Sequence, residues 1–579
     1  MKKAKKIFLG IFSFLLIVVV AGVLGGLSFR LGIGNAVDEY QRQAVYAPHG
    51  VVATSQPLAS QAGLDVLQAG GNAVDAAITA AAVLSVVEPY TTGIGGDMFA
   101  ILWLEAEQRF VGINASGPAG SLMTLDTLRA KREFPQSGPE SVTVPGALSG
   151  WAMLLERYGT ISLAEALAPA ISLAAEGFPV SESIASEWST FTIFPTDDPG
   201  FNETFRVDGE RAPEAREWFA NPDYARTLSR IAAAGPELLY GGELGDQIAA
   251  YVEAAGGYLT ARDLAGYQAS WVEPISVPYK GFRIWELPPN GQGIAALEML
   301  KILEPFDLES MGHNSADYLH YLIEAKKLAF ADLEAFVGDP AYMETTPDQL
   351  LADNFIASRR SMIDSRRAIT RAEPGSSLTT SDTTYLAVGD EQGNMISFIN
   401  SLAGGFGAKV VVPGTGFALQ NRAVGFTVAE GRANSAGPGR FPFHTIIPAF
   451  VTKEGEDGTQ EPWLSFGIVG GAQQPQAHVQ FLLNMLHFDM NVQEALDAPR
   501  FRHWEANRVS FESPIADAVL AELEAMGHES QFEILETMNL VVYGKNRGLM
   551  FGGGQAVERV QRGYVAGSDS RRDGLAAAH

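Results

Sequence analysis

The chain has 579 residues, which is long enough to bury a large hydrophobic core and by length alone suggests more than one domain. Asp and Glu total 67 against 41 for Lys and Arg, and the resulting net charge of −26 argues against non-specific binding to nucleic acid or anionic lipid. The chain contains no cysteine, so disulfides, thiolate nucleophiles and Cys-ligated metal sites are excluded.

The N-terminus has the pattern of a membrane anchor. Four lysines within the first six residues precede an uncharged run from Ile7 to Phe29, which Arg30 ends. A helix of that length, about 35 Å, crosses a hydrocarbon layer of about 30 Å. The basic residues predict a cytoplasmic N-terminus, a single pass through the cell membrane and a catalytic body outside the cytoplasm.

A cleaved signal peptide is the alternative, and it predicts a secreted or periplasmic protein. Its apolar region is usually about 7–15 residues long, and no clear A-x-A cleavage site is present. We therefore predict a retained anchor over residues 1–30, followed by a polar tether over residues 31–48.

From His49 the pattern is that of a folded body. A strand over Gly50–Ser55 and a helix over Pro57–Leu67 precede a mostly apolar helix over Asn72–Leu84, which we expect to be buried. The glycines of Gly93–Asp97 could suggest a phosphate cradle, but a cradle needs a strand before it and a helix after it. Here a helix precedes and a strand follows, so a tight turn is the better interpretation.

The middle third is largely helical and leads into a polar stretch. The predicted helices are Ser162–Ala175, Tyr224–Ala234, Leu244–Ala255, Ile294–Leu303 and Ser315–Ala335. Between residues 356 and 381 the sequence becomes polar and arginine-rich, and we expect this stretch to be exposed and mobile.

Strands resume at Thr383. Segments with strand character lie at Met395–Ser401 and Trp463–Val469, and a helix is predicted over Gln474–Leu486. Strands with helices on each side of residue 383 favour sheets covered by helices on both outer faces. Taken alone, Thr383 is no more than the first residue of a strand.

Taken together, these blocks resemble the gamma-glutamyltransferase family of N-terminal-nucleophile amidohydrolases, from about Val51 to Asp573. No single block is decisive, but their number, order and spacing are. The matching segments are Gly70–Ala77, Gly95–Asp97, Val142–Gly146, Glu324–Asp332, Asp382–Thr384, Gly470–Gly471 and Ala498–Arg500.

The resemblance implies an α+β fold of four layers, αββα, made as one precursor that cuts itself between Asp382 and Thr383. The large fragment would comprise residues 49–382 of the catalytic unit and the small fragment residues 383–579, and the two would stay together as a heterodimer. The Thr383 hydroxyl would attack the Asp382 carbonyl, and water would open the resulting ester. The freed amine, with an ordinary pKa of about 7.7–8.0, would then act as general base, so the reaction needs neither metal nor cofactor.

The resemblance also assigns roles to residues elsewhere. The N–H groups of Gly470 and Gly471 match the family's oxyanion donors, although two glycines after a strand are otherwise simply a turn. Ser401 stands where the family commonly has threonine and would orient Thr383. Thr384 is a further hydrogen-bonding neighbour. Arg571 matches a family arginine near the C-terminus that would contact the substrate, although alone it would pass as part of a solvated tail.

The positions that hold the glutamyl group in typical transferases differ in this chain. No arginine stands within Ile113–Gly117, where the family has one. Ala403 replaces an asparagine of the family, and His444–Thr445 replaces a pair of serines. The family's amide and acidic positions are occupied by Arg422 and Gly425. A site that lacks its charged partners loses most of its discrimination, so the substrate is not necessarily a gamma-glutamyl compound.

These departures look more like the branch that contains acylases and oxamate-type amidohydrolases. Arg422, His444 and Thr445 could bind a substrate carboxylate or oxo group. The alternative is that Arg422 balances a structural carboxylate from elsewhere in the chain.

Three functions follow. The first is a membrane-anchored, self-processing amidohydrolase or acyltransferase that cleaves or transfers gamma-glutamyl groups of glutathione-like substrates. The second is an acylase that hydrolyses a non-glutamyl small amide, of the cephalosporin-acylase or oxamate type. The third is a non-catalytic binding protein that keeps the fold, against which Thr383, Ser401 and the two glycines argue.

Overall fold

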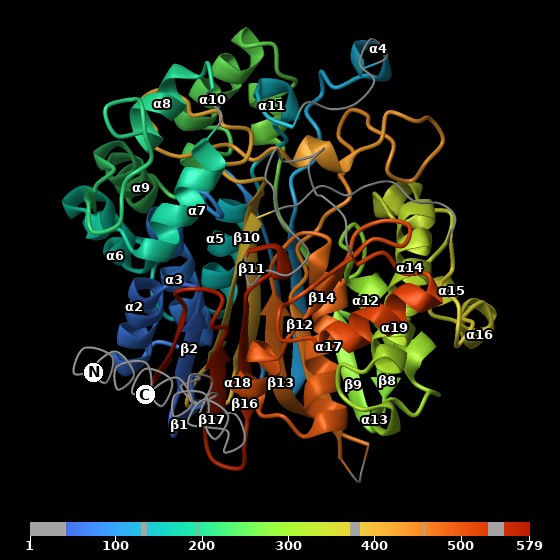
Figure 1. The fold of residues 1–579 in the computed structure, drawn as a ribbon. Helices are drawn as coiled ribbons and strands as arrows, with labels where there is room; N and C mark the ends of the chain where they lie inside the picture. Colours follow the sequence, from blue (N-terminus) through green and yellow to red (C-terminus); the bar gives the residue numbers. More distant parts are fainter. Residues whose placement is uncertain (1–41, 129–135, 194–195, 371–381, 456–457, 531–548) are drawn as a thin grey trace, which may run out of the picture. The chain divides into compact units, whose positions relative to one another are not determined.

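Two seven-stranded antiparallel sheets lie at the centre of the unit from Ala44 to His579 (Figure 1). The first sheet has the order β18 (Leu575–Ala578), β2 (Val51–Thr54), β10 (Asp382–Gly389), β11 (Met395–Ala403), β3 (Asp97–Leu104), β4 (Arg109–Ala115) and β7 (Ser270–Val272). The second has the order β1 (Val45–Ala47), β17 (Tyr564–Ser568), β16 (Gly554–Arg559), β13 (Gln460–Ile468), β12 (Ala449–Glu454), β9 (Phe282–Glu286) and β8 (Ile275–Tyr279).

The computed structural model describes residues 42–128, 136–193, 196–370, 382–455, 458–530 and 549–579. The predicted anchor, most of the tether and the last eleven residues of the polar stretch before Asp382 lie outside these ranges. Within them, no helix combines the length and the apolar character that crossing a bilayer requires. The anchor therefore stays a prediction.

Side chains alternate between the two faces of each central strand. In β10, Leu386 and Val388 pack into the core on the helical side of the first sheet, whereas Tyr385 and Ala387 pack into a core shared with the second sheet. In the second sheet, Phe466 packs against helices and Phe450 faces the first sheet. The two sheets therefore pack face to face.

Helices cover the outer face of each sheet. The helices α2 (Pro57–Gln68), α3 (Ala73–Val87) and α5 (Ala147–Tyr158) lie on the first sheet, and α12 (Gly293–Leu303) and α17 (Gln473–Phe488) lie on the second, as Figure 1 shows. The predicted α+β fold is confirmed, with two sheets between two helical layers.

The remaining elements extend these layers or connect them. Those that pack beside the first helical layer or join it to the rest are α4 (Leu125–Leu128), α6 (Leu163–Glu176), α7 (Glu182–Thr192), α8 (Pro199–Phe205), α9 (Pro222–Ala234), α10 (Glu243–Ala254), α11 (Ala261–Ala265), β5 (Phe178–Pro179) and β6 (Trp218–Phe219). Beside the second lie α13 (Leu308–Met311), α14 (Ala316–Phe336), α15 (Pro347–Leu350), α16 (Asp353–Arg360), α18 (Val492–Asp497), α19 (Asp517–Met526), β14 (Phe501–His503) and β15 (Val509–Phe511).

Two local features bring chain segments close to β10. Every residue of α3 is buried, as its alanine-rich sequence predicts, and Asn72 caps the helix through a reciprocal hydrogen-bond pair with Asp75. Gly95 and Gly96 form the turn before β3. A Cβ at Gly96 would lie 2.3 Å from the Ser401 carbonyl oxygen, so only glycine allows this approach. The turn therefore fixes β3 against the end of β11.

Candidate active site

Thr383 lies at the start of β10, where the pairing with β11 is irregular. Asp382 pairs with Ala403 and Thr384 with Asn400, so β11 carries one extra residue opposite Thr383. Such a bulge turns side chains away from the regular ladder. The Thr383 side chain is buried, and its Oγ1 donates a hydrogen bond to Ser401 Oγ at 3.2 Å. The predicted nucleophile and its predicted partner are thus in contact in the uncut chain.

Ser401 accepts further hydrogen bonds from two directions. The Ala403 backbone N–H donates to Ser401 Oγ at 2.9 Å, and Arg422 Nη2 donates to the same oxygen at 3.0 Å. Because the oxygen also accepts from Thr383, its position is fixed by three donors. Ser401 therefore connects Thr383 to the Arg422 guanidinium.

Arg422 begins a short 3-10 helix, η4 (Arg422–Gly425), and its side chain is buried. Its Nη1 donates to Thr445 Oγ1 at 2.9 Å, whereas Nε has no hydrogen-bond partner among the described residues. Burial lowers the pKa of Arg422 to about 10, so the group is still a cation at neutral pH. No described carboxylate forms an ion pair with it within 4.0 Å. A buried guanidinium with so little compensation is a candidate site for an anion.

Asp97, at the start of β3, is the carboxyl group whose charge acts on Arg422. Its Oδ1 accepts hydrogen bonds from Gly117 N at 3.0 Å, Gly146 N at 3.1 Å and Gln420 Nε2 at 2.9 Å. Burial raises the pKa of Asp97 to about 7, although Arg422 and these donors favour the ionised form. Asp97 therefore holds three loops together and titrates near neutral pH.

His444 lies against Asp97 and not against Thr383. His444 Nε2 is 3.0 Å from Asp97 Oδ2, and the Ile446 backbone N–H donates to Nδ1 at 3.3 Å, so Nε2 carries the proton and donates to the carboxylate. Burial lowers the pKa of His444 well below its usual range. The structure therefore places His444 on Asp97 and Thr445 beside Arg422, and the substrate contact of His444 stays a prediction.

Thr383 also lines a small cavity. The cavity has a volume of about 10 Å³, close to what one water molecule needs. Thr384 does not line it, but Thr384 Oγ1 lies 2.9 Å from the Oγ of Ser55, which does. The lining residues are Ser55, Glu88, Thr91, Thr383, Tyr385, Val469, Gly553, Gln555 and Arg572.

Gly470 and Gly471 follow β13 and precede α17. Both have positive φ, +125° and +63°, which glycine adopts readily. Neither backbone N–H donates a hydrogen bond to any described residue, and Val469, directly before them, lines the cavity beside Thr383. Two N–H groups without acceptors at a helix N-terminus have the character of oxyanion donors.

Arg571 lies outside this cavity. Its guanidinium pairs with Glu512 and Asp569 and donates to the carbonyl oxygens of Leu496 and Ala498. These partners occupy the side chain, so its position does not support the predicted substrate contact. The neighbouring Arg572 lines the cavity instead.

Sequence reasoning missed Ser55, Glu88 and Arg572. A charged residue directly after the buried apolar helix α3 was a signal for Glu88, because a carboxylate there must find polar partners. Asp97 was part of a matching motif but was given no role.

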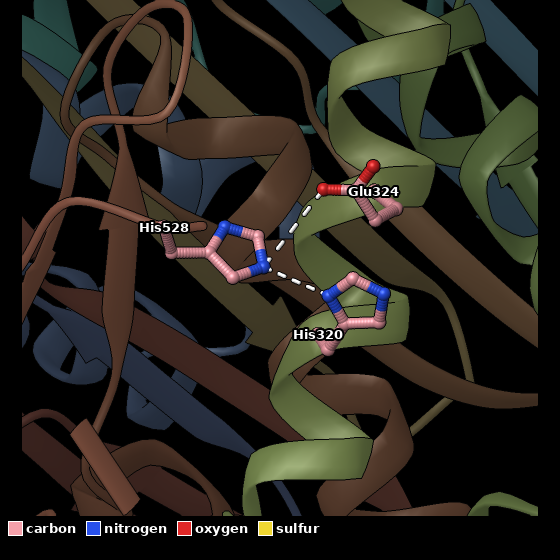
Figure 2. Close-up of side chains that lie close together, drawn as sticks. All are labelled: His320, Glu324 and His528. Carbon is pink, nitrogen blue, oxygen red and sulfur yellow. Dashed lines mark hydrogen bonds and ion pairs between the residues drawn. The ribbon is translucent and has the colours of Figure 1, made fainter. Parts of the chain in front are cut away.

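Among the described residues, His320, Glu324 and His528 form the one group that could hold a metal ion, with ligand atoms within 4.8 Å of one another (Figure 2). His320 Nε2 donates to the Asp364 carbonyl at 2.7 Å, so His528 Nε2 donates to His320 Nδ1 at 2.8 Å. Lys327 Nζ donates to Glu324 Oε1 at 2.8 Å. The charges of Glu324 and Lys327 cancel, and a divalent cation would add uncompensated charge to a buried site. The hydrogen bonds favour a structural contact between α14 and the loop after α19.

Comparison with known proteins gives consistent results. Residues 59–579 match the family model described as gamma-glutamyltranspeptidase. The glutathione hydrolase-like YwrD proenzyme of Bacillus subtilis strain 168 is 34% identical over 92% of this chain and 98% of its own length. The acylase ACY 1 proenzyme of Pseudomonas sp. strain SE83 is 35% identical over 84% of this chain and 88% of its own. A crystal structure of cephalosporin acylase from Bacillus halodurans has 43% identity and a TM-score of 0.85, covering 93% of this chain and 97% of that one.

Proposed function

Because the chain belongs to the gamma-glutamyltranspeptidase family, we propose that it is a self-processing amidohydrolase whose nucleophile, Thr383, is freed by a cut after Asp382. The observation that carries this proposal is the hydrogen bond between Thr383 Oγ1 and Ser401 Oγ at the bulge between β10 and β11. That bond fixes the hydroxyl group next to its own peptide bond.

The cut needs no external group to form the first bond. The Thr383 oxygen attacks the Asp382 carbonyl carbon, the peptide C–N bond breaks, and the nitrogen gains a proton. The resulting ester is opened by water, which leaves a carboxylate on Asp382 and a free amine on Thr383. The large and small fragments remain together as a heterodimer.

The mature enzyme uses the same hydroxyl against a substrate amide. The Thr383 amine removes the hydroxyl proton, and the oxygen attacks the amide carbonyl. The N–H groups of Gly470 and Gly471 donate to the oxyanion, and an acyl ester on Thr383 forms as the amine product leaves. Water, or a second amine in a transfer reaction, then releases the acyl group.

We infer that the acyl group carries a carboxylate. Arg422 Nη2 and Thr383 Oγ1 are bonded to the same Ser401 oxygen, at 3.0 and 3.2 Å, so a carboxylate bound to Arg422 and a carbonyl at Thr383 belong to one short acyl chain. Thr445 Oγ1, on the other arm of the guanidinium, is a further hydrogen-bonding group for it. The favoured substrate is the monoamide of a short dicarboxylic acid.

A gamma-glutamyl amide is the second candidate. The relative named a glutathione hydrolase-like proenzyme favours it. Gly425 stands where the family has an acidic residue, and Asp97 is already enclosed by His444 and Gln420, so neither of these two positions offers a carboxylate to a substrate amino group. Relative kcat/KM values for glutathione and for oxamate, succinamate and glutaramate decide between the two candidates.

The cell location is part of the proposal. The lysines before Ile7–Phe29 support a retained anchor, with the catalytic unit outside the cytoplasm. Sequencing the N-termini of both mature fragments and fractionating cells tests it. A large fragment that begins after residue 29 and stays soluble contradicts the anchor.

Thr383→Ala tests the nucleophile. We expect the variant to stay a single chain of 62.0 kDa on a denaturing gel and to hydrolyse no amide, because the hydroxyl that attacks in both reactions is missing. Thr383→Ser, which keeps a hydroxyl, is the matched control and should still be cut. Two bands from Thr383→Ala after prolonged incubation would falsify the assignment.

A further inference from the structure

The cavity beside Thr383 contains groups that the mature reaction does not use. Glu88, 6% exposed, lies at the C-terminal end of α3 and lines the cavity together with Thr383. Glu88 Oε2 accepts a hydrogen bond from Ser55 Oγ at 2.8 Å, and Thr91 Oγ1 donates to the Glu88 carbonyl oxygen at 2.9 Å. These contacts fix the end of α3 and the carboxylate at the cavity wall.

The first cut poses a chemical problem that the mature enzyme does not have. In the uncut chain the Thr383 nitrogen belongs to a peptide bond, so it cannot act as a base. The ester between Thr383 and Asp382 still has to be opened by water. The amine released when the ester forms has an ordinary pKa of about 7.7–8.0, so it is mostly protonated at neutral pH and a poor base for that water. A carboxylate beside the ester would serve this step better.

Among the described residues that line the cavity, Glu88 supplies the one carboxylate. Asp97, the other carboxylate described near Thr383, lies beyond Ser401 and Arg422 and is surrounded by its own donors. The cavity volume of about 10 Å³ suits one water molecule. In so small a cavity, that water would contact both Thr383 and Glu88, which line it.

We propose that Glu88 is the general base of self-cleavage and acts on one water molecule held in this cavity. The water oxygen forms a bond to the Asp382 carbonyl carbon while Glu88 takes a water proton. The C–O bond to Thr383 then breaks, and the Thr383 oxygen takes the proton back from Glu88. The products are a free Thr383 hydroxyl and an Asp382 carboxylic acid, which gives the second water proton to the Thr383 amine and becomes a carboxylate. This role rests on the proposed nucleophile.

Ser55 and Thr384 act as positioning residues in this step. Thr384 Oγ1 lies 2.9 Å from Ser55 Oγ, which donates to Glu88, so the residue next to the nucleophile is linked to the carboxylate. Arg572, which pairs with Glu187, lines the same cavity.

The test follows cleavage of freshly synthesised full-length chains on denaturing gels over time. Glu88→Gln keeps the size and loses the base, and we expect cleavage to slow by about 100-fold or more. Neutral hydroxylamine opens esters without a base, so it should cut the accumulated Glu88→Gln ester between Asp382 and Thr383. Glu298→Gln, an isosteric change at a buried carboxyl group in α12, is the matched control and should be cut at the wild-type rate.

Each outcome decides between the two proposals. Wild-type cleavage of Glu88→Gln beside an uncut Thr383→Ala overturns the role of Glu88 alone, whereas cleavage of Thr383→Ala overturns the nucleophile as well. A folded, uncut Glu88→Gln that resists hydroxylamine shows that the base acts before the ester forms, and overturns the step assigned here. If Glu88→Gln does not melt cooperatively, the variant is not folded, and the cleavage rate of Glu88→Asp tests the proposal instead. Glu88→Asp should be cut about 10-fold slower than wild type, and an unchanged rate contradicts the proposal.

Discussion

At the scale of single residues, the candidate site is a line of hydrogen bonds from Thr383 through Ser401 to Arg422 and Thr445. In the proposed function, the part near Thr383 carries out the reaction, and the part near Arg422 provides positive charge. The two parts meet at the Ser401 oxygen. Substitutions at Arg422 therefore distinguish an effect on the binding of a charged substrate from an effect on the position of the Thr383 hydroxyl.

Arg422→Met removes the charge and keeps a side chain of similar length. We expect kcat/KM for an acyl amide with a carboxylate to fall by about 30-fold or more, since losing a buried charged hydrogen bond costs about 2–5 kcal/mol. Self-cleavage should change far less. Arg422→Lys keeps the charge but lacks the planar guanidinium, so its kcat/KM should lie between those of the wild type and Arg422→Met. Equal losses of cleavage and hydrolysis would make Arg422 a structural residue.

The pH dependence of binding tests the coupling between Asp97 and Arg422. Since the pKa of Asp97 is raised to about 7, the carboxyl group is mostly neutral below pH 7 and ionised above it. The ionised form cancels part of the attraction between Arg422 and a substrate anion. We expect KM for an anionic acyl amide to rise by roughly 3- to 10-fold from pH 6 to pH 8, a change of about 1 kcal/mol.

A neutral acyl amide provides the control for this profile. The KM of the neutral substrate should not change as Asp97 ionises, because its acyl group has no charge for Arg422 to attract. The same rise for both substrates would assign the titration to another group, such as the Thr383 amine.

At the scale of elements, the site depends on how closely β3 approaches β11. The turn at Gly95 and Gly96 lets the start of β3, which carries Asp97, lie against the Ser401 carbonyl. The bulge opposite Thr383 lies at the same end of β11. Asp97 and Ser401 face each other at the end of the ladder between β3 and β11, so the close approach at Gly96 lies where the polar networks around these two residues meet.

Gly96→Ala tests this contact. A Cβ 2.3 Å from a backbone oxygen forces the strands apart, so we expect a loss of roughly 1–3 kcal/mol in the free energy of unfolding and slower self-cleavage. Chemical denaturation in a Thr383→Ala background measures stability without the cut. Gly266→Ala, whose new Cβ would come no closer than 3.2 Å to a neighbour, should change stability by far less. Similar effects of both substitutions would argue against a special role for Gly96.

At the scale of the whole unit, the proposed cut does not separate two domains. In the first sheet, β10 and β11 of the small fragment pair with β2 and β3 of the large one. In the second sheet, β12 pairs with β9, and β17 pairs with β1. Each sheet therefore contains strands from both sides of residue 382, and the buried cores are shared.

We accordingly expect the cut fragments to stay together at any concentration that can be measured. Size-exclusion chromatography of the fully cut protein should give one species with both fragments, and they should separate only in denaturant, in one cooperative transition with the loss of the sheets. The uncut Thr383→Ala protein is the reference for elution. Fragments that elute separately without denaturant would contradict the shared sheets.

Much of this fold follows from local sequence patterns. The alanine-rich run of α3 predicted a buried helix, and the turn at Gly93–Asp97 was predicted from the helix before it and the strand after it. Such features depend on periodicity, caps and glycine, which act within a few residues. Predicted helix ends lie within two residues of the observed ends at α9 and α14.

The sequence by itself determined the family, the order of elements and the candidate cut at Thr383, because motifs and the spacing between them can be recognised without knowing which residues are in contact. The tertiary structure decided which polar side chains meet. It placed His444 on Asp97, Arg422 on Ser401, and Glu88 in the cavity of Thr383. Those partners lie far apart in the chain and are joined only when two sheets and their loops pack, so no local pattern could reveal them.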